Sequence, residues 1–157
     1  MDKRIGHGQG DSADSQKGGR FRFRHAVDVR FRDLDAMGHA HHSLVLIYLE
    51  EARAKYWREV AGRAGLDAID YVLAEITVRY HRRIEYPQRL DIGVRTSRVG
   101  GKSFEQEFEI RSIEGERLAS GRTVQVMYDY SAGESKAVPA DIRDRIERFE
   151  ERGPGKD

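Results

Sequence analysis

The apolar run LVLIYL, at positions 44–49, follows closely after an acidic turn. Any fold of this chain must bury this run near its centre. A helix built from such a run has almost no polar side at its start, so the rest of the protein must enclose it. Charged residues return from Glu50 onward, so the far half of the helix should meet solvent. The apolar face keeps helical spacing through Val45, Tyr48, Leu49, Ala52, Tyr56 and Val60.

The segment before this helix has the two-residue period of a β-strand. Apolar and charged residues alternate over Val27–Phe31, which predicts a strand with one buried face. The strand leads to Asp35, seven residues before His42, where the helix should begin. The first N–H groups of a helix lack partners and carry the positive end of its dipole, so they can receive a developing negative charge. We therefore interpret residues 27–57 as an active-site segment.

Length and charge restrict the function classes. The 157 residues suffice for one domain with a real core but are few for an enclosed enzyme pocket, which favours partner subunits. With 28 basic and 27 acidic residues the formal charge is +1, so no overall field favours nucleic acid or a membrane surface. Cysteine is absent, which excludes disulfides and thiolate chemistry, and no apolar run approaches the ~18 residues of a membrane span.

The two ends of the chain differ from the rest in composition. Residues 1–20 are polar and glycine-rich, so ordering them would cost chain entropy without burying apolar surface. We expect a disordered tail there, one domain over 21–152 and a short tail over 153–157. The first residues do not have the pattern of a signal peptide, so the cytoplasm is the expected location.

Further strands are predicted after the helix, with no internal repeat. Glycines at 100–101 are a hairpin signal between two of them. Pro139 opens a short helix with Gly153 just past its end. One early apolar helix and several strands with an apolar inner face predict an α+β fold, an antiparallel sheet wrapped around the helix. The strand signals centre on Ile76–Ile84, Leu90–Val94, Phe104–Ile110 and Val124–Tyr128.

The stretch RFRDLDAMGHAHHSLVLIYLEEAR resembles the signature of the hotdog-fold acyl-CoA thioesterases of the 4-hydroxybenzoyl-CoA thioesterase type. Those proteins carry an aspartate in an acid-x-Asp turn, a glycine three residues on, and a helix with a Tyr-Leu-Glu-Glu-Ala-Arg-like end. The resemblance is close over residues 24–60 and looser to about 140. Many relatives have asparagines where this chain has His41 and His42, a departure that bears on substrate preference more than on reaction type.

The resemblance implies a hotdog fold, a five-stranded antiparallel sheet wrapped around a long central helix. It implies hydrolysis of acyl-CoA to a free acid and coenzyme A without a metal or organic cofactor. It also implies a homodimer or homotetramer with active sites between subunits. Two alternatives stay open: a hotdog protein that binds acyl-CoA or an acyl carrier without turnover, and a thioesterase that acts on an acyl carrier protein.

Two aspartates, Asp33 and Asp35, lie in the turn. Aspartate in a turn often only bonds the local backbone or caps a helix. The resemblance aligns Asp35 with the catalytic position of the family and leaves Asp33 as a structural residue. A carboxylate at that position can attack the thioester carbonyl directly or activate water as a general base, and the sequence does not choose between them.

Three histidines, His39, His41 and His42, stand between the turn and the helix. The usual zinc spacing of two histidines on one helical face with a third ligand is absent, so we expect no metal site. By resemblance, the backbone N–H of His42 points at the thioester carbonyl oxygen, and an oxyanion donor of this kind is worth roughly 3 kcal/mol. The His42 imidazole can also orient Asp35 or water. Gly38 and His39 are expected beside the substrate as parts of the turn.

One acid on the helix, Glu51, has two readings. It lies four residues before Lys55, so the two can form an ordinary surface pair. The resemblance aligns Glu51 with a helix acid that relatives place near the catalytic pocket, which makes it a candidate catalytic residue.

Coenzyme A needs cations for its phosphates, and several arginines and lysines are candidates. Pairing with glutamates on neighbouring strands would explain exposed arginines equally well. Relatives use a basic turn equivalent to residues 100–103 for the nucleotide end, so Lys102 and Ser103 are expected at the substrate together with Arg83. The cations at predicted strand ends or turns are Arg82, Arg83, Arg98 and Lys102.

Overall fold

The structure of the protein is a computed structural model that describes residues 21–65 and 68–151. The predicted tails, 1–20 and 153–157, lie outside the described residues. None of the helices in the described part is long and apolar enough to span a membrane. In chain order the elements are β1 (Phe23–Asp28), a 3₁₀ turn (Phe31–Asp33), α1 (Leu44–Glu59), β2 (Tyr71–Tyr80), β3 (Arg89–Val99), β4 (Ser103–Ser112), β5 (Arg117–Asp129), β6 (Glu134–Ser135) and α2 (Ala140–Glu151).

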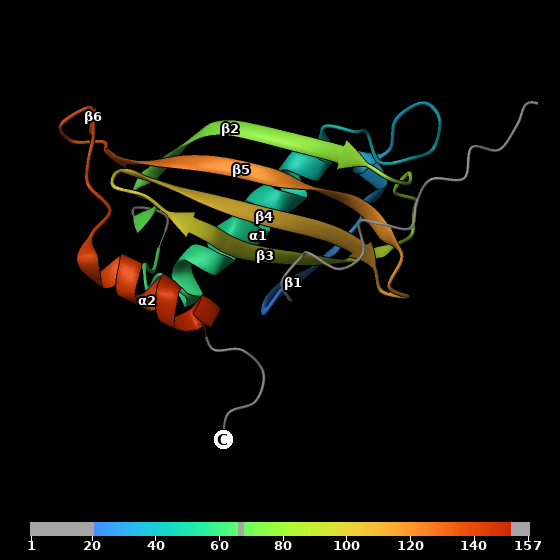
Figure 1. The fold of residues 1–157 in the computed structure, drawn as a ribbon. Coiled ribbons are helices and arrows are strands. Elements are labelled where there is room, and N and C mark those ends of the chain that lie inside the picture. The colour runs from blue at the N-terminus through green and yellow to red at the C-terminus, as the bar shows by residue number, and fades with distance from the viewer. Residues whose placement is uncertain (1–20, 66–67, 152–157) are drawn as a thin grey trace, which may run out of the picture.

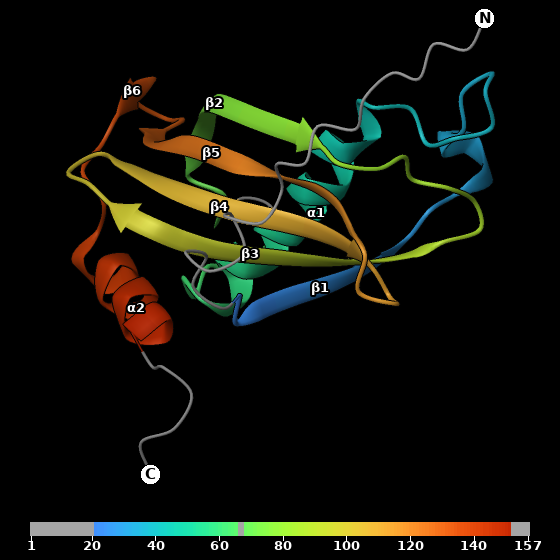
Figure 2. The ribbon, with the colours of Figure 1, turned by 45° about the vertical axis from the view of Figure 1, so that its right-hand side comes forward.

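The strands form one antiparallel sheet in the order β1–β3–β4–β5–β2, with the short β6 paired to the end of β5. α1 crosses one face of this sheet in both ribbon views, and α2 lies at one end beside β3 (Figure 1; Figure 2). The predicted α+β hotdog fold is confirmed, with one short strand beyond the five expected. β1 and β2 are the edge strands of the long sheet, so in the described part of the chain each has one row of backbone N–H and C=O groups that pairs with no other strand.

The buried side of α1 is the predicted one. Val45, Tyr48, Leu49, Ala52 and Tyr56 are all buried against the inner face of the sheet. Enclosure on every side, which the apolar start of the helix predicted, is wrong for the single chain. Two residues of the run are exposed: Leu46, and Ile47 with 56% of its surface in solvent. The sheet covers only one side of the helix, so these two need another partner to lose contact with water.

The first strand begins and ends earlier than predicted. β1 stops at Asp28, and Phe31 is 75% exposed in the 3₁₀ turn that follows. The cause is Asp33, whose Oδ2 accepts the backbone N–H of Arg30 at 2.9 Å and turns the chain away from the sheet. The Arg30 N–H thus bonds the nearby Asp33 side chain and not a neighbouring strand of the sheet.

A polar band runs through the interior between α1 and the sheet. The expected apolar inner face is wrong for β5, because Thr123 and Gln125 are fully buried while Val124 is only partly so. Arg53 belongs to the charged half of α1 that was expected to meet solvent, but it is 6% exposed. Its Nη1 lies 3.2 Å from the side-chain amide of Gln125 and donates to that amide when its oxygen faces the guanidinium. A buried guanidinium requires polar neighbours, and the inward-facing amide of β5 supplies one.

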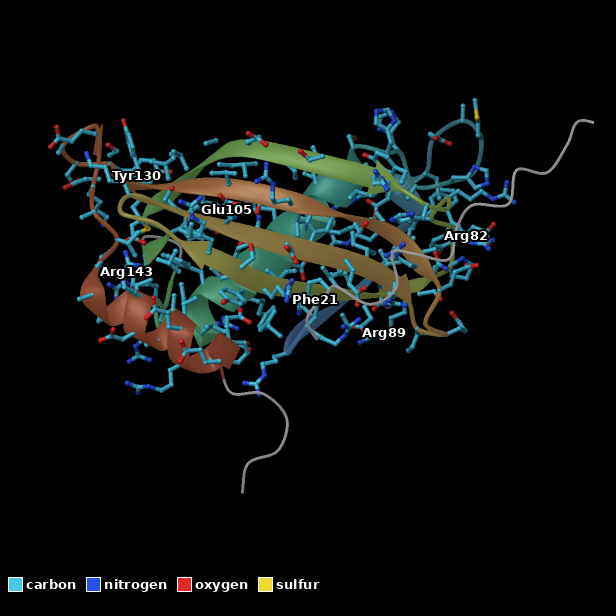
Figure 3. The ribbon with its side chains drawn as sticks, viewed as in Figure 1. Phe21, Arg82, Arg89, Glu105, Tyr130 and Arg143 are labelled. Carbon is cyan, nitrogen blue, oxygen red and sulfur yellow. The ribbon has the colours of Figure 1, made fainter. Side chains whose placement is uncertain are left out.

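The predicted C-terminal helix is confirmed as α2, and two sets of bonds fix it to β3. Arg143, labelled in Figure 3, donates to the backbone oxygens of Val99 and Gly100 at 3.1 and 2.6 Å. Glu150 Oε1 accepts the Tyr56 hydroxyl at 2.7 Å and the backbone N–H of Thr96 at 2.8 Å. The pairing of β3 with β4 shifts register just after Thr96, so this carboxylate bonds the strand next to an irregularity.

Glu150→Ala should lower the free energy of unfolding by about 2–3 kcal/mol, because it leaves the Tyr56 hydroxyl and the Thr96 N–H without their charged acceptor. The measurement is urea denaturation followed by circular dichroism, with the midpoint shifted and the slope unchanged. Glu147→Ala is the matched control, since exposed Glu147 only approaches Arg143 at 3.8 Å and should change stability by less than about 0.5 kcal/mol. Equal effects of the two substitutions would contradict this account of how α2 is held.

Candidate active site

The turn that carries Asp35 is closed by short backbone bonds. Leu34 and Ala40 form an isolated antiparallel bridge, and Asp35 N–H donates to the His39 oxygen at 2.8 Å. Gly38 adopts a φ of +78°, a conformation that L side chains rarely adopt, so the turn requires a glycine at this position. The predicted turn and its glycine therefore have a direct structural basis.

Asp33 fixes this turn to α1. Its buried carboxylate accepts the Tyr48 hydroxyl at 2.6 Å, besides the N–H of Arg30. Its backbone oxygen accepts the N–H of His41 at 3.0 Å. Burial and the adjoining carboxylate raise the pKa of Tyr48, so its hydroxyl keeps the proton it donates. All of this supports a structural role for Asp33 and leaves Asp35 as the aspartate that faces solvent.

Asp35 is held as a carboxylate with one oxygen free. Met37 N–H donates to its Oδ1 at 2.8 Å, and His39 N–H approaches the same atom at 3.4 Å. The N–H of Met37, with smaller contributions from His39 and the His41 imidazole, holds the pKa of Asp35 below its ordinary value. Oδ2 accepts no hydrogen bond from the residues that the structure describes. An ionised carboxylate with a free oxygen is what a nucleophile or a general base requires.

One backbone N–H at the start of α1 is also free. Among the described residues, His42 N–H has no acceptor, whereas every other N–H from Ala40 to Leu46 has one. Ser43 precedes α1 without a side-chain bond to it, and no acidic residue stands in the first turn. Neither the cap residue nor the first turn of α1 thus supplies a group that offsets the positive end of the helix dipole. The acceptors are the backbone oxygens of Ile84, Asp33, His41, His42 and Ser43, and Nδ1 of His41.

Asp35 and His42 line the same cavity, with a volume of about 420 Å³. It opens between the turn, the start of α1 and the end of β2. The predicted residues Asp35, His39, His42 and Arg83 come together there. The other lining residues are Ala40, Val45, Tyr80, His81, Arg82 and Ile84.

The remaining predicted site residues lie elsewhere. Glu51 binds His25 of β1, Oε1 to Nε2 at 2.8 Å, and lines a separate cavity of about 290 Å³. The turn between β3 and β4 is at the opposite end of the sheet (Figure 1); Lys102 lies in this turn, and Ser103 is the first residue of β4. Within one chain, therefore, neither Glu51 nor the basic turn reaches the cavity that contains Asp35.

Sequence reasoning missed Tyr80 and His81 as members of the cavity. Tyr80 donates its hydroxyl to the His42 oxygen at 2.8 Å, and His81 Nε2 bonds Ser120 Oγ at 2.8 Å. Both follow from where β2 ends, since Tyr80 pairs with Ala119 at the end of the sheet that faces the turn. The only sequence signal was the polar cluster that closes this strand. No group of three or more histidine, aspartate or glutamate side chains in the described ranges could hold a metal ion.

Comparison with known proteins gives the family. The family model of the thioesterase-like superfamily matches residues 29–146. A thioesterase of Thermus thermophilus, solved with coenzyme A and zinc, is 35% identical, with a TM-score of 0.72, over 83% of this chain and 95% of its own. A suspected acyl-CoA thioesterase of Xanthomonas campestris is 32% identical, with a TM-score of 0.61, over 68% and 92%. YsmA of Bacillus subtilis (strain 168), itself uncharacterized, is 30% identical over 115 residues, 73% of this chain and 78% of its own.

An antiparallel sheet around one long helix, together with these matches, defines a hotdog-fold thioesterase, an enzyme that hydrolyses thioester bonds. The chain belongs to the thioesterase-like superfamily, because the family match covers most of its length. The resemblance stated from the sequence is confirmed at the level of family and fold.

The carboxyl of Asp35 should titrate below its ordinary value of 3.8, because the Met37 N–H bonds the charged form. This interaction stabilises the fold fully above pH 3.8 and is lost as the pH falls through the lower folded pKa. The measurement is the ¹³C chemical shift of the side-chain carboxyl against pH, compared with the same chain unfolded in urea. A folded-state pKa at or above the unfolded one would contradict the geometry of the turn.

Proposed function

We propose that the enzyme hydrolyses acyl-CoA to a free carboxylic acid and coenzyme A, with Asp35 as nucleophile or general base. The proposal is carried by one observation: the same cavity is lined by Asp35, whose Oδ2 accepts no bond from the described residues, and by His42, whose N–H has no acceptor among them. One group can attack or activate water, and the other can bind the oxygen that becomes negative. The Thermus relative solved with coenzyme A supports the choice of thiol carrier.

Two reaction routes can use these groups. As a nucleophile, Asp35 Oδ2 bonds the carbonyl carbon, the C–S bond breaks, coenzyme A leaves as thiolate, and water hydrolyses the mixed anhydride. As a general base, Asp35 takes a proton from water, the hydroxide adds to the carbonyl carbon, and the C–S bond breaks as the thiolate takes a proton. In either route the N–H of His42 donates to the oxyanion, an interaction worth roughly 3 kcal/mol in other enzymes.

Asp35→Asn should reduce thiol release from acyl-CoA about 100- to 10,000-fold, because the amide is neither a useful nucleophile nor a base. The amide oxygen can still accept the Met37 N–H, so the fold and acyl-CoA binding should persist. Thiol release is followed with a chromogenic disulfide, and binding by calorimetry.

The matched control for that test is Asp141→Asn. Asp141 is an exposed aspartate whose pKa is also lowered, in its case by Arg63, and it stands at the start of α2 on the side of the sheet away from β2 (Figure 1). Its variant should keep the parent rate. Parent-like turnover in both variants would make Asp35 a turn residue, and a parent that binds acyl-CoA without releasing thiol would favour a non-catalytic binding protein.

We also propose that the enzyme is a homodimer built on the free edge of β2. This strand is ten residues long and, among the described strands, pairs only with β5; Leu73 and the ring of Tyr80 are exposed on it. Two β2 strands paired antiparallel across a two-fold axis would bring the Lys102 end of one subunit to the Asp35 end of the other. The separation of Lys102 from Asp35 within one chain is the reason to propose that each site draws on both subunits.

Hybrid dimers test this arrangement. A dimer of one Asp35→Asn chain and one Lys102→Ala chain keeps a single site with intact Asp35 and an intact Lys102 from the other subunit. It should have the parent Michaelis constant and about half the parent turnover. The Lys102→Ala homodimer should have a raised Michaelis constant, because a cation for the nucleotide is lost. A raised constant in the hybrid would mean that Lys102 serves its own chain, and failure to isolate a hybrid at all would argue against the dimer.

A further inference from the structure

Tyr80 forms a contact that neither the proposed chemistry nor the stability of the sheet explains. It is the last residue of β2, about half exposed, and its hydroxyl donates to the backbone oxygen of His42 at 2.8 Å. Its ring lies edge-on to the His42 imidazole, with centroids 6.4 Å apart. An exposed bond of this kind contributes little to folding, yet it joins an edge strand to the residue whose N–H is free.

The start of α1 needs such an outside bond. The side chain of Ser43 does not cap the helix, and the bond inside the helix to the His42 oxygen, from Val45 N–H, is long at 3.4 Å. The preceding peptide is better fixed, because the His41 oxygen accepts Leu44 N–H at 2.8 Å. With Tyr80 on the next oxygen, the peptides on both sides of His42 are held, so the direction of its N–H is set.

We propose that Tyr80 is a positioning residue for thioester hydrolysis: its hydroxyl holds the peptide that follows His42. This bond limits rotation of the His42 backbone and, together with the Leu44 bond to the peptide that carries the N–H, keeps that N–H toward the substrate oxygen. The inference rests on the proposed function, since it gives that N–H the role of oxyanion donor. Preorganised donors stabilise a developing charge more than mobile ones do, because no reorientation is needed during the reaction. Tyr80 does not itself touch the reacting atoms in this role.

The test is Tyr80→Phe, which keeps the ring beside His42 and removes only the hydroxyl. Turnover should fall about tenfold, less than the 100- to 1,000-fold expected when an oxyanion donor is removed outright. The Michaelis constant should stay within about twofold, because the loss concerns the transition state and not ground-state binding. The pH profile should keep its shape, since Tyr80 carries no proton to or from the substrate.

Tyr56→Phe is the contrasting variant. Tyr56 is a buried tyrosine of α1, and its hydroxyl donates to Glu150 and accepts a hydrogen bond from Thr96. Its loss should lower the melting temperature and leave turnover unchanged, whereas Tyr80→Phe should do the reverse. Unchanged turnover in Tyr80→Phe with an active parent would overturn the inference alone. A changed alkaline side of the pH profile would make Tyr80 an acid and overturn it too. An inactive parent would overturn both the inference and the proposed function.

Discussion

The buried bond between the Tyr48 hydroxyl and the Asp33 carboxylate fixes the geometry of this enzyme. It ties the turn after β1 to the second turn of α1, at 2.6 Å and away from water. The same carboxylate oxygen bonds Arg30 N–H and so ends the first strand. A buried charged acceptor without donors would be strongly unfavourable, so the loop has little freedom to leave the helix. Asp35, two residues on, is held near the start of α1 by this anchor.

The sequence predicted those parts of the fold that depend on local periodicity. Helical spacing identified the buried side of α1, and alternation identified β3, whose Leu90, Ile92 and Val94 are fully buried. Periodicity failed where polar groups are buried in pairs. Arg53 and Gln125 each violate the pattern of their own element, and their buried side chains meet in the interior beside Gln106 and Thr123. No single-element pattern can foresee a partner on a different strand.

The same distinction separates the predictable and unpredictable parts of the site. Asp35 and His42 lie at the two ends of one short turn that Gly38 allows, so their spacing alone brings them to the same cavity. Tyr80 is 38 residues from His42 in sequence, and its arrival depends on the register of β2 with β5. Lys102 shows the converse case. The sequence showed that Lys102 lies in a glycine turn. The end of the sheet at which this turn lies depends on the strand order, which the sequence pattern does not give.

Two arginines give the cavity a positively charged side. Arg82 and Arg83 line it, and each forms an exposed pair, with Glu116 at 2.9 Å and with Glu85 at 3.0 Å. Such exposed pairs contribute little to stability, typically under about 1 kcal/mol, so the two arginines can exchange their partners at small cost. A guanidinium group can form paired, charge-assisted hydrogen bonds with a phosphate as well as with a carboxylate. The pairs therefore hold the two arginines near the mouth of the cavity while leaving them free to exchange partners.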